Sequence, residues 1–442
     1  VRTPRVCVVP DYKRTLVGEH VDFITKKEVT DGKGKTHKKS VLEERVMDLE
    51  LNAFDGQGLV DPTFAIYWSE DMNLDYIPSS FVVRSVWIKG NLARFDFKEL
   101  ARQNGITTIK DRWGKEYNID DIDVILSESQ FKMYKYYKSW DDYLFYANKA
   151  GIKWGVSRYN KKYDDDYVLA NYQYIQALTL PQEDIDKLIK PTIDWLQDIC
   201  TGNQLTALLY SFGAQGTHCN YQDLYSKANS AHLKAVVKNT EFLQDAHVQK
   251  QIYGNIIESI NKSKIGKIWL RGNYSFMIAD PYAQAQWVLG MEPTGLLKRD
   301  EVYSGYWAKT DVEKLDLCRS PLIDTHEHNP CNLNKEPLLQ EWYQYLNSGI
   351  IYNIYDTSCF RHSDSDFDGD IVLSTDNEYF IKGSHKEQNI ITYEKGAAPA
   401  HKLRLSNQVE CDLRGLGTGV GGFSNCATIM SAMKGNFTSP AH

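Results

Sequence analysis

Strand-like and helical patterns alternate along this 442-residue chain and divide it into four parts. Residues 1–135 hold short β-branched and aromatic runs separated by Gly, Asp and Pro turns, and residues 261–404 show the same pattern. Between them, residues 136–260 carry apolar side chains at helical spacing, and residues 405–442 hold Gly-rich turns and the start of a helix. The pattern predicts an α+β fold in which a helical connector joins two β modules.

Single segments support this division. The clearest strand patterns are Arg5–Val9, Thr63–Trp68, Phe81–Val83, Lys267–Leu270, Ile350–Tyr352 and Ile371–Leu373. Apolar residues at helical spacing follow Ile185 and Val248, although Pro191 is expected to kink or split the first of these helices. The lysine-rich insert Lys26–Arg45 carries Gly32 and Gly34 and is expected to be an exposed loop or hairpin.

Composition excludes several classes of protein. A hydrophobic content of 42% and a charged content of 25% are typical of a folded chain, and the net charge of −7 excludes a basic coat protein. Eight scattered cysteines without a CxxC pair indicate reduced thiols in the cytoplasm, and no apolar run approaches the roughly 18 residues needed to span a bilayer. No secretory leader opens the chain. Because the first residue is Val and the last stretch, Asn425–His442, resembles the start of a helix cut short, we expect a fragment of a longer polypeptide.

Three aspartates alternate in the run Asp366-Phe367-Asp368-Gly369-Asp370. Residues two apart in an extended segment point to the same side, where three carboxylates repel one another at neutral pH. A hard cation such as Mg²⁺ relieves this repulsion because it prefers oxygen ligands. Gly369 allows the backbone to bend, and Phe367 is free to anchor the loop in the core. The sequence therefore predicts a divalent-metal site at Asp366, Asp368 and Asp370.

Two other interpretations of this run were weighed. An acidic surface turn explains it equally well on composition alone, because Ser363, Asp364 and Ser365 make the whole stretch polar. A calcium loop of the EF-hand type fails, since no Glu lies at the twelfth position counted from Asp364 or Asp366.

Four further elements lie in a fixed order around the aspartates. In chain order they are Asp55-Gly56-Gln57-Gly58, Phe81-Val82-Val83-Arg84 with Lys89-Gly90, Ser129-Gln130-Phe131-Lys132-Met133, and Arg319-Ser320-Pro321. Taken singly, each has an ordinary explanation, such as a Gly-rich turn or an exposed lysine at the end of a strand.

Taken together with the aspartates, these elements resemble the motifs of RNA polymerases whose active site lies between two double-psi β-barrels. That superfamily includes the largest subunit of cellular RNA polymerases, the eukaryotic RNA-silencing polymerases and single-chain polymerases of phages and prophages. The resemblance spans about residues 50–430, but between 136 and 260 it consists of a helical pattern alone. The sequence departs from the family pattern at Met133, where an aromatic residue is usual. The resemblance implies two double-psi β-barrels, at 1–135 and 261–404, with the active site between them.

The resemblance also implies roles for single residues. Asp366, Asp368 and Asp370 would hold one Mg²⁺, and a second would arrive with the nucleoside triphosphate in a two-metal mechanism, with Mn²⁺ as a substitute. Lys89 and Lys132 would supply fixed positive charge to the phosphates and the transcript end. Arg319 and Arg84 would bind substrate, because a planar guanidinium suits ribose and phosphate.

The implied function is template-directed RNA synthesis by a monomeric, single-chain nucleotidyltransferase in a bacterial or phage-infected cell. Its partners would be NTPs, the RNA product and a nucleic-acid template. DNA is favoured as template because the phage branch matches best. The alternative template is RNA, copied by an enzyme of the silencing type. The alternative functions are a non-catalytic nucleic-acid-binding scaffold and a nuclease with clustered aspartates.

Cys318, His326, His328 and Cys331 lie close together in the sequence and could form a zinc site, but their spacing matches no standard zinc motif. We expect local structural or substrate-positioning roles for them.

Overall fold

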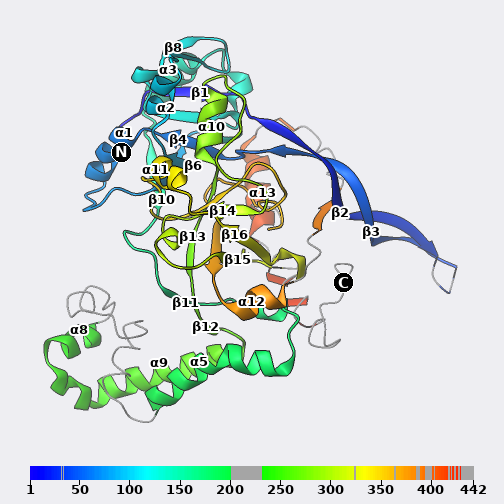
Figure 1. Cartoon of the computed structure of the whole chain (residues 1–442), viewed down its shortest axis with the longest axis vertical. Helices are drawn as coiled ribbons and strands as arrows, with labels where there is room; N and C mark the ends of the chain where they lie inside the picture. The colour runs from blue at the N-terminus through cyan, green and yellow to red at the C-terminus, as the bar shows by residue number, and fades with distance from the viewer. Residues whose placement is uncertain are drawn as a thin grey trace.

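Strands and helices are interspersed as an α+β fold that contains one closed β-barrel and a six-stranded sheet (Figure 1). The computed structural model describes residues 1–200 except 31 and 33, then 231–322, 325–362, 365–384, 389–393 and parts of 401–429. The tail begins with helix α13 (Leu405–Gly415), and the helix start expected after the Gly-rich turns, from Asn425, falls largely outside the described residues.

The first unit is a sheet that we expected to be a barrel. Its strands, in order across the sheet, are β1 (Val6–Val9), β9 (Val124–Ser127), β4 (Gln57–Val60), β6 (Ile88–Arg94), β5 (Ser80–Ser85) and β10 (Gly155–Tyr159). No pair between β1 and β10 closes it among the described strands; β10 is irregular between Val156 and Arg158 and is largely exposed. Because β10 pairs with β5, the unit also extends beyond residue 135, where we expected the connector to begin.

The second unit is the closed barrel. Its strands, in order around the barrel, are β13 (Asn273–Ala279), β17 (Ile350–Tyr352), β14 (Glu301–Tyr303), β16 (Asn329–Leu333), β15 (Lys314–Cys318) and β18 (Ile371–Thr375). The predicted strands at Ile350–Tyr352 and Ile371–Leu373 are confirmed. Buried Val, Ile, Leu, Met and Tyr side chains from these strands fill the interior.

The two units share one strand order. Counted along the chain, both run 1-5-2-4-3-6 across the sheet or around the barrel. The pairs match in direction as well, since 1 with 5 and 2 with 4 are parallel and the other three shared pairs are antiparallel. The barrel adds the closing antiparallel pair of its first and sixth strands. Equal order and direction in six strands indicate that the units are two versions of one architecture.

Several helices follow the strands of these units. They are α1 (Pro62–Asp71), α2 (Phe97–Gln103) and α3 (Trp140–Lys149) in the first unit, and α10 (Pro281–Val288), α11 (Pro337–Trp342) and α12 (Glu378–Gly383) in the second. Helix α1 corrects our prediction of a strand at Thr63–Trp68. Asp61 accepts a hydrogen bond from the Phe64 amide at the helix start, Pro62 occupies the first turn, and Phe64 and Trp68 lie one turn apart on the buried side.

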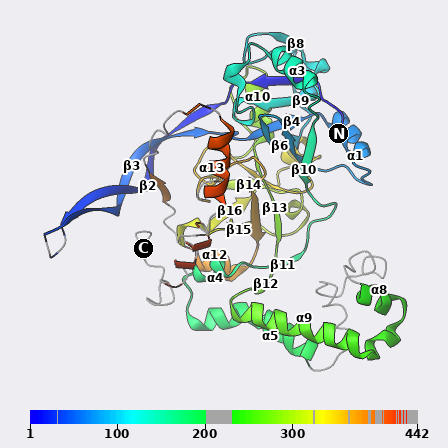
Figure 2. The same ribbon diagram turned by 180° about the vertical axis from the view of Figure 1, so that it is seen from behind.

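A long hairpin is inserted after the first strand of the sheet. Strands β2 (Lys13–Thr30) and β3 (Thr36–Asn52) pair along almost their whole length, which confirms the hairpin expected for Lys26–Arg45. Figures 1 and 2 show its distal part projecting away from the rest of the molecule. Near its base, β19 (Ile390–Tyr393) adds a parallel strand along residues 21–24.

The connector contains the longest described helices, α5 (Gln182–Cys200) and α9 (Ala246–Lys264), with α8 (Ala231–Lys238) beyond them (Figure 2). Helix α5 runs through Pro191, so the expected split is wrong. Leu188 is buried before the proline, and Thr192 after it accepts a hydrogen bond from the Trp269 amide, so packing holds both halves in one helix. Strands β11 (Tyr167–Leu169) and β12 (Trp269–Arg271) link this layer to the barrel. None of the described helices is both long and apolar enough to cross a membrane.

A single hydrophobic core joins the two units. It includes Leu59 and Val82 from the sheet and Phe276, Ile278 and Ile351 from the barrel. Two buried glutamines add polar contacts across this interface. The Gln57 amide donates to Ala279 O (2.9 Å) and accepts from Ala279 N (2.8 Å), and the Gln284 amide donates to Gln57 O (2.9 Å). The position of one unit relative to the other is therefore fixed by apolar packing and by matched hydrogen bonds.

We expect Gln57→Leu to destabilise the protein by about 2–5 kcal/mol, because it leaves two buried backbone groups of Ala279 without partners. Gln103→Leu is the matched control, since Gln103 lies on an exposed part of α2 and its loss is expected to change stability by about 0.5 kcal/mol or less. Urea unfolding followed by circular dichroism measures both. Equal midpoints for the two variants would contradict this role of Gln57.

Candidate metal centre and nucleotide site

The loop Asp366–Asp370 precedes β18 of the barrel and is wound tightly by its own hydrogen bonds. Asp366 Oδ1 accepts from the Asp368 amide, and Asp370 Oδ2 accepts from the Asp366 amide, both at 3.1 Å. Phe367 is 4% exposed and packs in the barrel core, as predicted. Gly369 has φ 123°, a conformation that strongly favours glycine. The loop therefore holds its three carboxylates together while Phe367 fixes it to the core.

The three carboxylates face one another. Oxygen atoms of Asp366, Asp368 and Asp370 lie within 4.8 Å of one another. Burial, followed by the charge of Asp368, raises the pKa of Asp366 to about 6. Such a group of anions fits a divalent cation, because oxygen ligands and uncompensated negative charge are what Mg²⁺ and Mn²⁺ require.

Two cationic side chains reach this group from different units. Lys89, near the start of β6, forms an ion pair with Asp368. Arg319, directly after β15, forms an ion pair with Asp370 at 3.0 Å and is only 18% exposed. The structure thus brings together five of the predicted site residues: the three aspartates, Lys89 and Arg319.

The other two predicted residues lie further from the aspartates. Lys132 is exposed. Burial raises the pKa of the Asp55 carboxyl, and the positive charge of Lys132 partly offsets this rise. Arg84 lies opposite Lys89 in the pairing of β5 with β6, so both side chains leave the same face. Its described side-chain hydrogen bond is to Val83 O. Lys132 therefore lies at the edge of the site, whereas Arg84 has no described contact with the aspartates.

Asp55 is a site residue that the sequence analysis did not assign. Its carboxyl is affected by the charge of Asp368, and its carbonyl accepts a hydrogen bond from the Phe367 amide at 2.9 Å. The next residue, Gly56, has φ 77°, and a Cβ there would lie 2.7 Å from Asp368 Cβ. The Asp-Gly pair was visible in the sequence, but its contact with a loop some 300 residues later was not.

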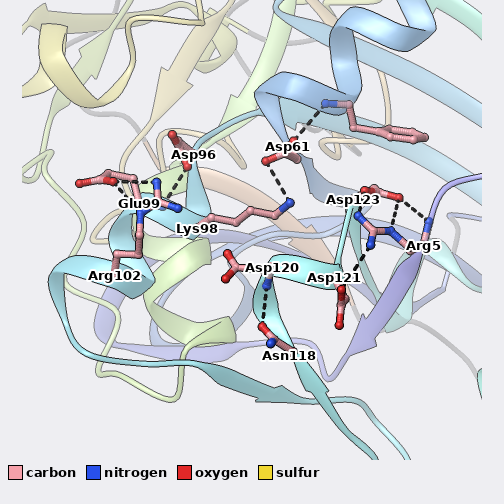
Figure 3. A network of polar contacts seen from close by, with 11 residues as sticks. Arg5, Asp61, Asp96, Lys98, Glu99, Arg102, Asn118, Asp120, Asp121 and Asp123 are labelled. Carbon is pink, nitrogen blue, oxygen red and sulfur yellow. Dashed lines mark hydrogen bonds and ion pairs between the residues drawn. The ribbon is translucent and has the colours of Figure 1, made fainter.

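A second group of acidic side chains lies in the first unit and differs from the metal loop in its partners (Figure 3). Asp123 pairs with Arg5 at 2.7 Å, and Asp61 pairs with Lys98 at 3.4 Å and caps α1. Asp96 caps α2. Cations and helix amides of the chain itself neutralise these carboxylates, which gives them a structural role.

Metal binding is expected to depend on pH through Asp366. The folded protein holds the Asp366 proton more tightly than the unfolded chain does, so without metal this group's contribution to stability is lost as the pH rises from 3.8 to about 6. A cation bound above that range restores it. We expect Mn²⁺ to raise Tm at about pH 7.5, and its affinity to fall about tenfold for each pH unit below about 6.

Asp366→Asn is expected to abolish this Tm shift, whereas Asp120→Asn, at an exposed carboxylate of the first unit (Figure 3), is expected to retain it. Scanning calorimetry with and without Mn²⁺ measures both variants. A Tm shift of equal size at about pH 5 and pH 7.5 would contradict the assignment.

Comparison with known proteins gives one relative in sequence. No family model matches the chain. A DNA-directed RNA polymerase, YonO, of Bacillus phage SPbeta is 27% identical over 396 residues, which cover 88% of this chain and 44% of that protein. Among solved structures, the RNA dependent RNA polymerase QDE-1 from Thielavia terrestris aligns with a TM-score of 0.49 and 13% identity, over 80% of this chain and 36% of that one. The chain is therefore similar over most of its length to a phage DNA-directed RNA polymerase, and it spans less than half of that relative.

Proposed function

We propose that this chain carries the catalytic centre of an RNA polymerase that adds ribonucleotides to an RNA 3′-hydroxyl. The main support is the meeting of three carboxylates from one unit with Lys89 from the other, in a chain 27% identical to a phage DNA-directed RNA polymerase. The two units share one strand order and have the charged residues between them, which supports a paired architecture, although, among the described strands, only those of the second unit form a closed barrel.

In this proposal Asp366, Asp368 and Asp370 hold Mg²⁺. When bound, the cation stabilises charge on the attacking and leaving oxygens of a phosphoryl transfer. Lys89 and Arg319 each form an ion pair with one of these aspartates. Both cations are therefore positioned to contact the phosphates and the ribose of an incoming nucleotide. Their fixed positive charge favours the transition state because it needs little reorganisation. Lys132, at the edge of the site, binds the transcript end.

The relative's name favours DNA as the template, and we propose DNA for this chain too. The charges of the site act on phosphates and sugar, whereas the template sequence is read by base pairing. An RNA template is therefore the second candidate, and it is distinguished by experiment.

The test is extension of a labelled RNA primer on DNA and on RNA templates with Mg²⁺ and NTPs. We expect the chain to extend the primer on DNA, and Asp368→Asn to lose at least about 100-fold in rate, because a ligand of the cation is removed. No extension on either template would contradict the proposal. Degradation of the strands would favour a nuclease.

Lys89→Ala is expected to lose about 100-fold in extension rate, with Lys115→Ala as its matched control. Both lysines pair with an aspartate and are about equally exposed, at 46% and 47%, but Lys115 pairs with Asp141 away from the site. Single-turnover rates at saturating NTP measure the difference. Equal rates for the two variants would remove Lys89 from the proposed mechanism.

A further inference from the structure

Next to Arg319, three side chains that bind metals in other proteins meet on the outer face of the barrel, where Tyr174 and Phe380 cover them. Asp316 and Cys318 lie two residues apart on β15, so both point to one side of the strand. His328 directly precedes β16; because Leu317 lies opposite Asn329, the antiparallel register continues with Cys318 opposite His328. All three residues are 0% exposed, and a nitrogen, a sulfur and an oxygen of the group lie within 4.8 Å of one another.

Hydrogen bonds fix the orientation of the imidazole. His328 Nε2 lies 2.8 Å from Tyr174 O, and since a carbonyl only accepts, Nε2 carries a proton. The other ring nitrogen, Nδ1, faces Asp316 Oδ2 at 2.6 Å and Cys318 Sγ at 3.2 Å. A histidine that donates to a backbone carbonyl while its second nitrogen points into a ligand group is typical of metal sites.

Only one oxygen of the Asp316 carboxylate has described hydrogen-bond partners. Its Oδ2 lies beside the Cys318 thiol and His328 Nδ1. In addition, Asp316 Oδ1 is buried and accepts no hydrogen bond in the described part of the chain. Buried anions and lone pairs of this kind call for a compensating positive charge.

We propose that Asp316, Cys318 and His328 form a second metal site, of the Zn²⁺ class. Nitrogen, sulfur and carboxylate ligands suit Zn²⁺, whereas the all-oxygen group at Asp366–Asp370 suits Mg²⁺, so the two sites select different ions. Glu327, 2% exposed and adjacent to His328, is a candidate for the fourth ligand.

This site would fix the position of Arg319. Arg319 directly follows Cys318 in the sequence. A metal bound to Cys318 and His328 limits the positions open to Arg319, which pairs with Asp370. The role is structural and separate from the proposed nucleotidyl transfer.

The test is metal content of the whole chain. After loading with Zn²⁺ and gel filtration in excess Mg²⁺, we expect about one zinc per chain by mass spectrometry. With Co²⁺ in its place, we expect a thiolate-to-cobalt absorption band. Cys318→Ser is expected to lose both signals, and Cys331→Ser, which removes another buried thiol of the same barrel, is expected to keep both.

Asp368→Asn separates this proposal from the proposed function, because it is expected to keep the zinc while losing extension of RNA. A wild-type chain that is folded by circular dichroism but retains no zinc would overturn the proposal and leave a metal-free Asp–His–Cys hydrogen-bond network. Loss of the cobalt band in Cys331→Ser to the same extent as in Cys318→Ser would overturn it as well.

Discussion

Mutual repulsion among Asp366, Asp368 and Asp370 is the constraint on which the rest of the site depends. Three carboxylates within 4.8 Å of one another are stable only with positive charge beside them. The chain supplies part of that charge through Lys89 from the sheet and Arg319 from the barrel. The sheet must therefore lie against the metal loop, which explains why Gly56 has no room for a side chain and why Gln57 is bonded to the barrel backbone.

The shared strand order places these residues at equivalent positions of the two units. Lys89 is the second residue of the fourth strand, β6, and Arg319 directly follows the third strand, β15. Both therefore lie at the turn between the third and fourth strands of their units. Lys132 and the aspartates both lie between the fifth and sixth strands. Corresponding parts of the two units thus carry cations in the first unit and, in the second, an arginine and the metal ligands. Two copies of one framework facing each other are enough to assemble a site of mixed charge.

Much of this could be predicted from the sequence, and the failures have physical causes. The metal loop, the hairpin and the two barrel strands at Ile350–Tyr352 and Ile371–Leu373 follow from local patterns. Residues Thr63–Trp68 were taken for a strand because they are aromatic and β-branched, although Asp61 and Pro62 signal a helix start. The contact of Asp55 with the metal loop and the meeting of Asp316 with His328 depend on long-range packing, which spacing along the chain does not reveal. The open edge between β1 and β10 is likewise a property of tertiary structure.

The common hydrophobic core has a further consequence for how this chain can be divided. Its apolar side chains come from strands on both sides of the helical connector, so neither half alone can cover its share of this common core. The connector gives the covalent link, but the interface gives the specificity of assembly. A backbone cut within the connector would leave two fragments that still match each other in shape and in hydrogen bonding. The charged centre is encoded in two distant stretches of sequence, yet it belongs to one cooperative unit.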